Sequence, residues 1–175
     1  MAYGRAGSEE SLAVRDVRQV AEQYLTGGKM TLVWPEGVPS EHTAEQRGYL
    51  KTILNVIVLA EETLAYGGVI TVRGLGEGEL GCRVEVVGRN AHLSEAMQAA
   101  LSGSAEIEDL SPRTIQAYVT GRFASHFGFS VTYDHSIPDR LDLILSASTE
   151  AKTEAEPGPV VIEEDDTPEP MVQVV

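Results

Sequence analysis

Two stretches of apolar residues at helical spacing occupy the first third of the chain. The second runs over residues 44–66 and ends at Gly67-Gly68. Between the two stretches, residues 30–34 form a short β-prone run that Pro35 ends, and we expect a loop from there to about Ala44. The first stretch follows Ser11 as an expected N-cap, stops before Gly27-Gly28, and has apolar residues every three or four positions: Val14, Val17, Val20, Ala21, Tyr24 and Leu25.

Strand patterns alternate with shorter helical ones in the rest of the chain. Residues 69–72 and 80–87 predict two strands, and the glycine-rich residues 74–78 between them favour a hairpin turn. Residues 93–101 predict a short helix after a loop at residues 88–92. Ser111-Pro112 predicts the start of another helix, which continues to about Phe127. Residues 129–133 and 141–146 predict a second hairpin around a turn at residues 135–140.

The predicted order of elements is α, β, α, β, β, α, α, β, β. Hairpins pair their strands antiparallel, and the helices then cover one face of the sheet. The sequence therefore predicts an α+β fold, a two-layer sandwich of a mainly antiparallel sheet with helices on one face, and not a parallel βαβ sheet.

The acidic charge of the chain is concentrated at one end. The 175 residues include 13 Lys and Arg against 27 Asp and Glu, a formal net charge of −14. Residues 149–175 hold eight carboxylates against Lys152 alone, so half of the net charge, −7, lies there. We expect these residues to form a disordered acidic tail that solvates the protein, with a docking peptide as the open alternative.

Composition also excludes several classes of protein. An acidic chain lacks the excess of basic residues that binds the phosphates of nucleic acid, and an anionic membrane surface would repel it. The longest apolar run, residues 53–60, is too short to cross a membrane, and the first residues lack the apolar region of a signal peptide. We therefore expect a cytoplasmic protein with neither nucleic acid nor membrane as a partner.

Few residues are candidates for chemistry. The single cysteine, Cys82, falls in a strand pattern, where we expect it to pack in the core. His42 and His92 fall in predicted loops, His135 in a predicted turn, and His126 in the last turn of a predicted helix, where the helix dipole favours a cation. No histidine stands at metal-ligand spacing from a second ligand type, and residues 74–78 precede a strand rather than the helix that a phosphate loop needs. We expect no catalytic residue, no metal and no cofactor in this chain.

One block nevertheless resembles a nucleotide-binding fold. Residues 50–72 combine a helix with one asparagine, Asn55, then Gly67-Gly68 and a β-branched strand, and this combination is similar to the N-box region of the histidine-kinase ATPase (Bergerat) fold. The resemblance implies a magnesium-holding amide or acid four residues after Asn55, where this chain has Leu59. It also implies an Asp-x-Gly-x-Gly loop at residues 86–91, where this chain has no carboxylate and only Gly88. Because Mg²⁺ requires oxygen ligands, Asn55, Leu59 and Gly88 are expected to be vestigial nucleotide-site positions.

From about Ala2 to Ala147, the chain resembles the ChpT-type histidine phosphotransferases of alphaproteobacterial phosphorelays. Five segments carry the resemblance: residues 2–8, the helix at 14–25, Leu32-Val33-Trp34, the Asn55 helix with its two glycines, and residues 110–118. The family implies a homodimer built from a two-helix hairpin, followed by a degenerate kinase-type ATPase domain. It also implies transfer of phosphate from the receiver domain of a hybrid histidine kinase, through a hairpin histidine, to response regulators.

The chain departs from that pattern at its start. Residues 2–8 correspond to the end of the second hairpin helix, and no histidine is followed by an aspartate. We therefore expect three regions: the end of a truncated dimerisation-helix region at 1–10, the degenerate ATPase-like domain at 11–148, and the acidic tail at 149–175. A fragment, a misplaced start codon and a truncated paralogue all remain open.

Three functions remain open at this stage. The first is the C-terminal domain of a histidine phosphotransferase, which contacts receiver domains but lacks the acceptor histidine. The alternatives are an ATP-binding kinase-type module with unusual ligands and a non-enzymatic interaction domain whose acidic tail docks a basic partner. Arg15 and Arg18 on the first helix are the candidate partner contacts, with ordinary surface ion pairing as their other explanation.

Overall fold

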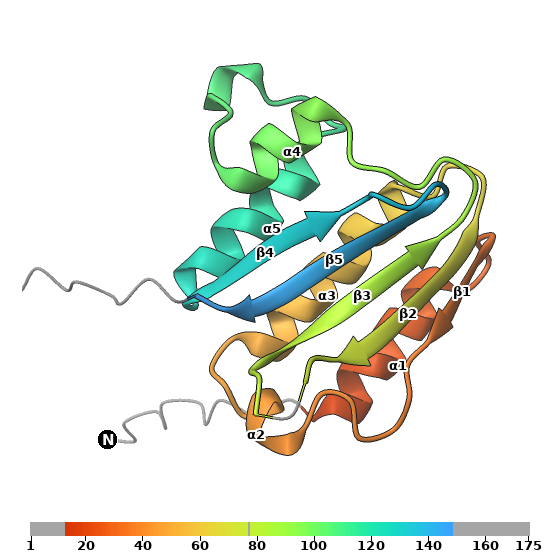
Figure 1. Cartoon of the computed structure of the whole chain (residues 1–175), viewed down its shortest axis with the longest axis vertical. Helices are drawn as coiled ribbons and strands as arrows, with labels where there is room; N and C mark the ends of the chain where they lie inside the picture. The colour runs from red at the N-terminus through yellow and green to blue at the C-terminus, as the bar shows by residue number, and fades with distance from the viewer. Residues whose placement is uncertain (1–12, 77, 149–175) are drawn as a thin grey trace, which may run out of the picture.

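A computed structural model describes residues 13–76 and 78–148 of the protein (Figure 1). The regions predicted at 1–10 and 149–175 lie outside the described residues. The elements follow in the order α1 (Val14–Leu25), β1 (Met30–Val33), α2 (Glu41–Ala44), α3 (Tyr49–Glu62), β2 (Gly68–Gly74), β3 (Gly81–Val87), α4 (Glu95–Ser102), the 3-10 turn η1 (Ile107–Asp109), α5 (Ile115–His126), β4 (Phe129–Asp134) and β5 (Arg140–Ala147).

The five strands form one sheet in the order β1-β2-β3-β5-β4. Both predicted hairpins are confirmed, because β2 pairs antiparallel with β3 and β4 pairs antiparallel with β5. The β1–β2 pair is parallel, with Met30 opposite Gly68. The chain crosses from β1 to β2 through α3, so one βαβ unit stands at an edge of an otherwise antiparallel sheet, which the prediction did not include.

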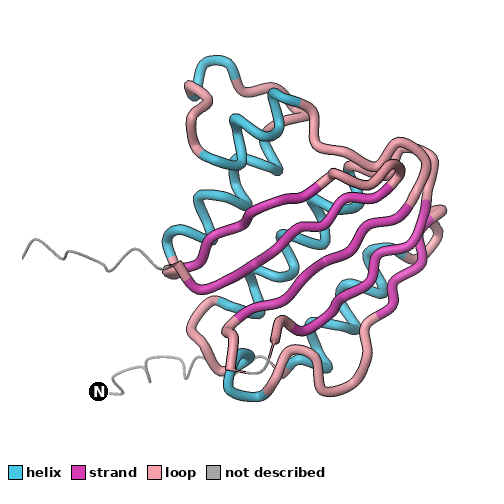
Figure 2. The backbone as a smooth tube through the Cα atoms, viewed as in Figure 1, coloured by secondary structure: helices cyan, strands magenta, loops and turns pink. Residues whose placement is uncertain are grey.

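The helices α1, α3 and α5 lie on one face of the sheet, as the sequence predicts (Figures 1 and 2). Inward-facing strand residues alternate with outward-facing ones, and the inward set is fully buried: Ile70, Val72, Cys82, Val84, Val86, Leu141, Leu143 and Leu145. Helix α3 supplies the facing layer, with Ile53, Val56, Ile57 and Ala60 also at 0% exposure. The α+β two-layer prediction is therefore correct. None of the described helices has the length and apolarity needed to cross a membrane.

Several helix boundaries differ from the sequence predictions. The helix predicted over residues 44–66 begins only at Tyr49, because Gly48 just before it adopts a left-handed φ of 76°. The short helix α2 lies at the end of the segment predicted as a loop. Helix α3 ends at Glu62, five residues before Gly67. Helix α1 has Ala13 in its N-cap position, while Ser11 lies outside the described residues.

The start of α5 also differs from its prediction. The helix begins at Ile115 and not at Ser111-Pro112. The Ser111 amide donates to the Thr114 hydroxyl at 2.9 Å, and the Thr114 amide donates to the Ser111 carbonyl at 2.9 Å. These bonds form a turn ahead of the helix, because serine and threonine side chains compete with helical hydrogen bonding.

The open face of the sheet is covered by paired charges. Arg140 donates two hydrogen bonds to Asp142, at 2.9 and 2.8 Å, and lies 2.9 Å from a Glu85 oxygen. The hydrogen bonds that Arg140 donates to Asp142 raise the pKa of Arg140. Arg83 approaches Asp142 at 3.5 Å, and Arg73 approaches Glu85 at 3.3 Å. Because these carboxylates already have cationic partners, the open face does not resemble an apolar docking surface.

Gly48 provides a direct test of how α3 meets α5. A Cβ at Gly48 would overlap the ring of Phe127, which follows α5, whereas a Cβ at Gly37, with the same φ of 76°, would meet nothing within 4 Å. We expect Gly48→Ala to lower the free energy of unfolding by about 3 kcal/mol, from backbone strain and overpacking together. The control Gly37→Ala should cost about 1 kcal/mol from strain alone. Urea denaturation measures both, and equal losses would contradict the packing of Phe127 on Gly48.

Candidate functional site

The candidate site begins at Asn55, which lies half-buried on α3 where α5 packs against it. Its side-chain amide donates to the Lys51 carbonyl at 2.9 Å, so its nitrogen is bound within its own helix. Its side-chain and backbone oxygens accept hydrogen bonds from the Gln116 amide at 3.4 and 3.3 Å, and the Thr120 hydroxyl contacts the backbone oxygen at 3.4 Å. The polar atoms of Asn55 therefore serve the α3–α5 contact.

Leu59, one turn further along α3, is fully buried in the core. A leucine offers no oxygen to a cation, and this one has no contact with solvent. Gly88 lies at the end of β3, where a Cβ would approach the Gly67 carbonyl to 2.6 Å and the Leu64 side chain to 2.6 Å. The absence of a side chain at Gly88 allows β3 to end against Gly67, and its amide donates to the Asp139 carbonyl at 3.0 Å. Gly88 thus has a packing role in this structure.

A cleft of about 490 Å³ lies elsewhere, between the α2 region and the glycine-rich β2–β3 turn. Ser40, His42 and Gly81 are among its lining residues, whereas Asn55, Leu59 and Gly88 are not. His42 is in α2 and not in a loop, because Ser40 caps this short helix by accepting from the Thr43 amide. The remaining histidines occupy their predicted places: His92 in a loop, His126 at the end of α5, and His135 between β4 and β5. Among residues 13–76 and 78–148, no cluster of three metal-ligand side chains occurs.

The two candidate partner contacts differ in exposure. The Arg15 side chain is 82% exposed and lies 3.7 Å from Asp16. The Arg18 side chain is only 27% exposed and lies 3.9 Å from Glu22, one helical turn away. Both ion pairs are of the weak surface kind. Val20 and Tyr24 are about half exposed on the same helix.

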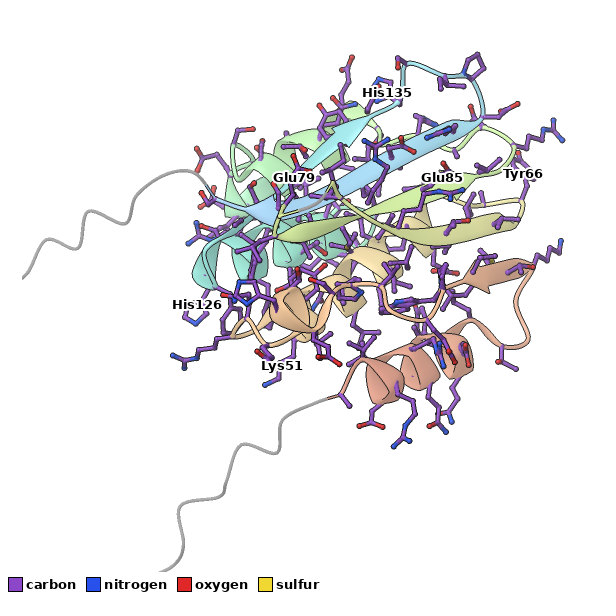
Figure 3. The ribbon with its side chains drawn as sticks, turned by 60° about the horizontal axis from the view of Figure 1, so that its bottom comes forward. Lys51, Tyr66, Glu79, Glu85, His126 and His135 are labelled. Atoms are coloured by element: carbon purple, nitrogen blue, oxygen red, sulfur yellow. The ribbon has the colours of Figure 1, made fainter. Side chains whose placement is uncertain are left out.

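A second surface, which sequence reasoning missed, runs along α5 beside the N-terminal half of α3. Ile115 and Val119 are exposed on α5, and Arg122 and His126 continue the same stripe at helical spacing. Lys51 is exposed on α3, and Figure 3 shows Lys51 and His126 both pointing outward on the same side of the fold. We call Lys51, Ile115, Val119, Arg122 and His126 the α3–α5 face. The signal was available in the sequence, because α5 contains no acidic residue in an otherwise acidic chain.

The comparisons with known proteins agree with this fold. The family described as the histidine phosphotransferase C-terminal domain matches residues 14–138. A solved structure described as a bacterial phosphotransferase has the same fold, with a TM-score of 0.60 and 20% sequence identity. That similarity covers 77% of this chain and 64% of the other, so the chain spans less than two thirds of the length of that structure. No curated protein matches the chain.

The chain belongs to the histidine phosphotransferase C-terminal domain family. The resemblance drawn from the sequence is therefore confirmed at the level of the family and of the fold.

Replacing Leu59 by asparagine would restore the oxygen ligand that the kinase-type pattern has there. We expect Leu59→Asn to lower the free energy of unfolding by about 4 kcal/mol, because it creates a cavity and buries an amide among apolar side chains. The half-buried neighbour is the matched control, and Val58→Asn should cost about 1 kcal/mol. Urea denaturation gives both values. A stable Leu59→Asn variant that bound ATP with Mg²⁺ would mean that Leu59 borders an open nucleotide site.

Cys82 is fully buried beside the Tyr49 hydroxyl, and burial raises the pKa of its thiol to about 12. At pH 8 the thiol therefore stays protonated, and the thiolate is the reactive form. We expect iodoacetamide to leave Cys82 unmodified in the native protein at pH 8 and to modify it fully in concentrated urea, measured by mass spectrometry. Rapid modification of the native protein would contradict the burial of Cys82.

Proposed function

We propose that this chain acts in a phosphorelay as the protein-contacting C-terminal domain of a histidine phosphotransferase, and that it binds receiver domains and no nucleotide. Membership in the family supports the phosphorelay role. The partners we propose are the receiver domains of a hybrid histidine kinase and of response regulators. The acceptor histidine belongs, in this proposal, to a helical hairpin that precedes the domain.

The observation that carries the proposal is the closed contact at Asn55. Helix α5 sits on α3 so that Gln116 and Thr120 use the oxygens of Asn55, and Leu59 is inside the core. A triphosphate with Mg²⁺ requires oxygen ligands and an open groove at this place. The fold is retained, but the polar groups of Asn55 make hydrogen bonds within the domain. This arrangement favours a role in binding proteins.

In the whole protein, the acceptor imidazole would attack the phosphorus of a receiver's aspartyl phosphate. The P–N bond forms as the P–O bond to the aspartate breaks, and the released carboxylate stays on the receiver. The receiver supplies the Mg²⁺ and most of the catalytic groups. The domain described here would contribute binding energy and orientation.

The exposed side of α1 is our proposed receiver contact. Arg15 is the most exposed cation of this helix, and Val20 and Tyr24 offer apolar area beside it. A cation next to half-exposed apolar residues suits a partner surface that is acidic at its rim. Arg18 is less suited, because most of its side chain is covered.

Two measurements on the full chain test the proposal. Biolayer interferometry against the receiver domains of the source organism should give saturable binding to at least one of them. Titration calorimetry with ATP and Mg²⁺ should give no binding heat. Binding of no receiver would overturn the proposal, and saturable ATP binding would favour the kinase-type alternative.

A matched pair of variants locates the contact. Arg15→Glu should weaken receiver binding about tenfold, because it reverses a rim charge. Lys29→Glu makes the same change of charge in the turn before β1, at another exposed position, and should leave binding unchanged. Equal effects of the two variants would mean that net charge, and not the α1 surface, governs binding.

A further inference from the structure

The cations on the open face of the sheet and those on the α3–α5 face differ in their partners. Those on the open face of the sheet, Arg73, Arg83 and Arg140, have carboxylate partners. Lys51 and Arg122 on the α3–α5 face form no ion pair with any carboxylate of residues 13–76 and 78–148. The first turns of α3 and α5 also contain no acidic residue. This face is therefore a positive region on a protein whose net charge is −14.

Apolar area continues this positive region along α5. Val119 is 40% exposed and Ile115 is 45% exposed, one and two turns before Arg122. Carboxylates bound the surface at both ends. Glu41 and Glu45 lie in or beside α2, and Glu61 and Glu62 lie at the end of α3. An occupant must therefore place its own acidic residues near Lys51 and Arg122 and its apolar residues near Val119.

The described chain ends next to this face. The Ser148 amide donates to the Gly128 carbonyl at 2.8 Å, and Gly128 follows α5 by two residues. Ser148 thus lies beside the C-terminal end of α5, the helix that ends with His126. Whatever follows Ser148 in sequence therefore starts at the C-terminal end of α5, one turn from Arg122.

The sequence after Ser148 has the complementary order. Glu150, Glu154 and Glu156 come first, and the apolar run Val160-Val161-Ile162 comes next. Along α5, read from its C-terminal end, His126 and the cation Arg122 come first, and Val119 and Ile115 follow. In this direction, the acidic residues of the tail come level with the basic part of the face, and its apolar run comes level with the apolar residues of α5.

We propose that residues 150–162 of the acidic tail dock on the α3–α5 face of the same chain, antiparallel to α5. Twelve residues separate Ser148 from Val160 and reach about 40 Å when extended. Helix α5 is only about 18 Å long, so the tail reaches every part of it.

Paramagnetic broadening of amide signals in the full chain tests this proposal. Gly158→Cys carries a nitroxide next to the apolar run. Cys82 does not compete for the label, because it is fully buried. The amides of Val119 and Phe123 in α5 should broaden strongly, and the amide of Thr31 in β1 should not. Broadening that is absent from α5 would overturn the proposal.

Charge reversals on both sides identify the contact. Lys51→Glu with Arg122→Glu should abolish the broadening of α5, and adding Glu154→Lys with Glu156→Lys should restore it. Lys29→Glu is the matched control and should leave the broadening unchanged. Loss of broadening in the control as well would overturn the proposal, since any change of net charge would then suffice.

A mixture separates docking within one chain from docking between chains. Nitroxide-labelled chain without ¹⁵N is mixed with unlabelled ¹⁵N chain, and only contacts between molecules then broaden signals. The proposal expects no broadening of α5 in this mixture. Broadening there would show that the face binds a second copy, and would overturn docking within one chain.

Discussion

The packing of α5 on α3 is the contact on which the rest of this domain depends. The two helices run antiparallel, because Asn55 meets Gln116 and Thr120 near the start of α5, while Gly48, just before α3, lies against Phe127 after α5. The hydrogen bonds are long, and each neutral bond contributes about 1 kcal/mol at most. The larger contribution comes from the apolar residues of α3 that this arrangement keeps in the core, and Leu59 is one of them. The contact thus stabilises the helical layer. It also occupies the polar atoms of Asn55, which kinase-type domains use to bind a nucleotide.

The surfaces of the domain follow from this arrangement. The open sheet face has its carboxylates paired with arginines, and Asn55 does not line the cleft beside α2. The exposed side of α1 and the α3–α5 face are left as surfaces where cations stand beside exposed apolar residues. We assign the first to a receiver domain and the second to the acidic tail, so a partner and a segment of the chain itself need not compete for the same residues.

Much of the fold was predictable because its signals are local. The alternating apolar residues of β2, β3 and β5 and the glycine-rich turn after Gly74 predict the antiparallel hairpins directly. The parallel β1–β2 pair was missed, because pairing across α3 depends on how a helix packs and not on any local pattern. The late start of the predicted 44–66 helix was missed for a similar reason. Phe127, far along the sequence, occupies the space that a side chain at Gly48 would need.

The candidate site was predictable in its chemistry and not in its geometry. Leu59 shows from residue type alone that a magnesium ligand is missing, whereas the closure of Asn55 depends on Gln116 and Thr120, which stand more than sixty positions later. The central claim is that this closure leaves no place for a nucleotide. Hydrogen–deuterium exchange of the full chain, with and without excess ATP and Mg²⁺, tests it most directly. The account predicts unchanged exchange in α3 and α5, and protection of the segments around Asn55 and Gln116 by ATP would contradict it.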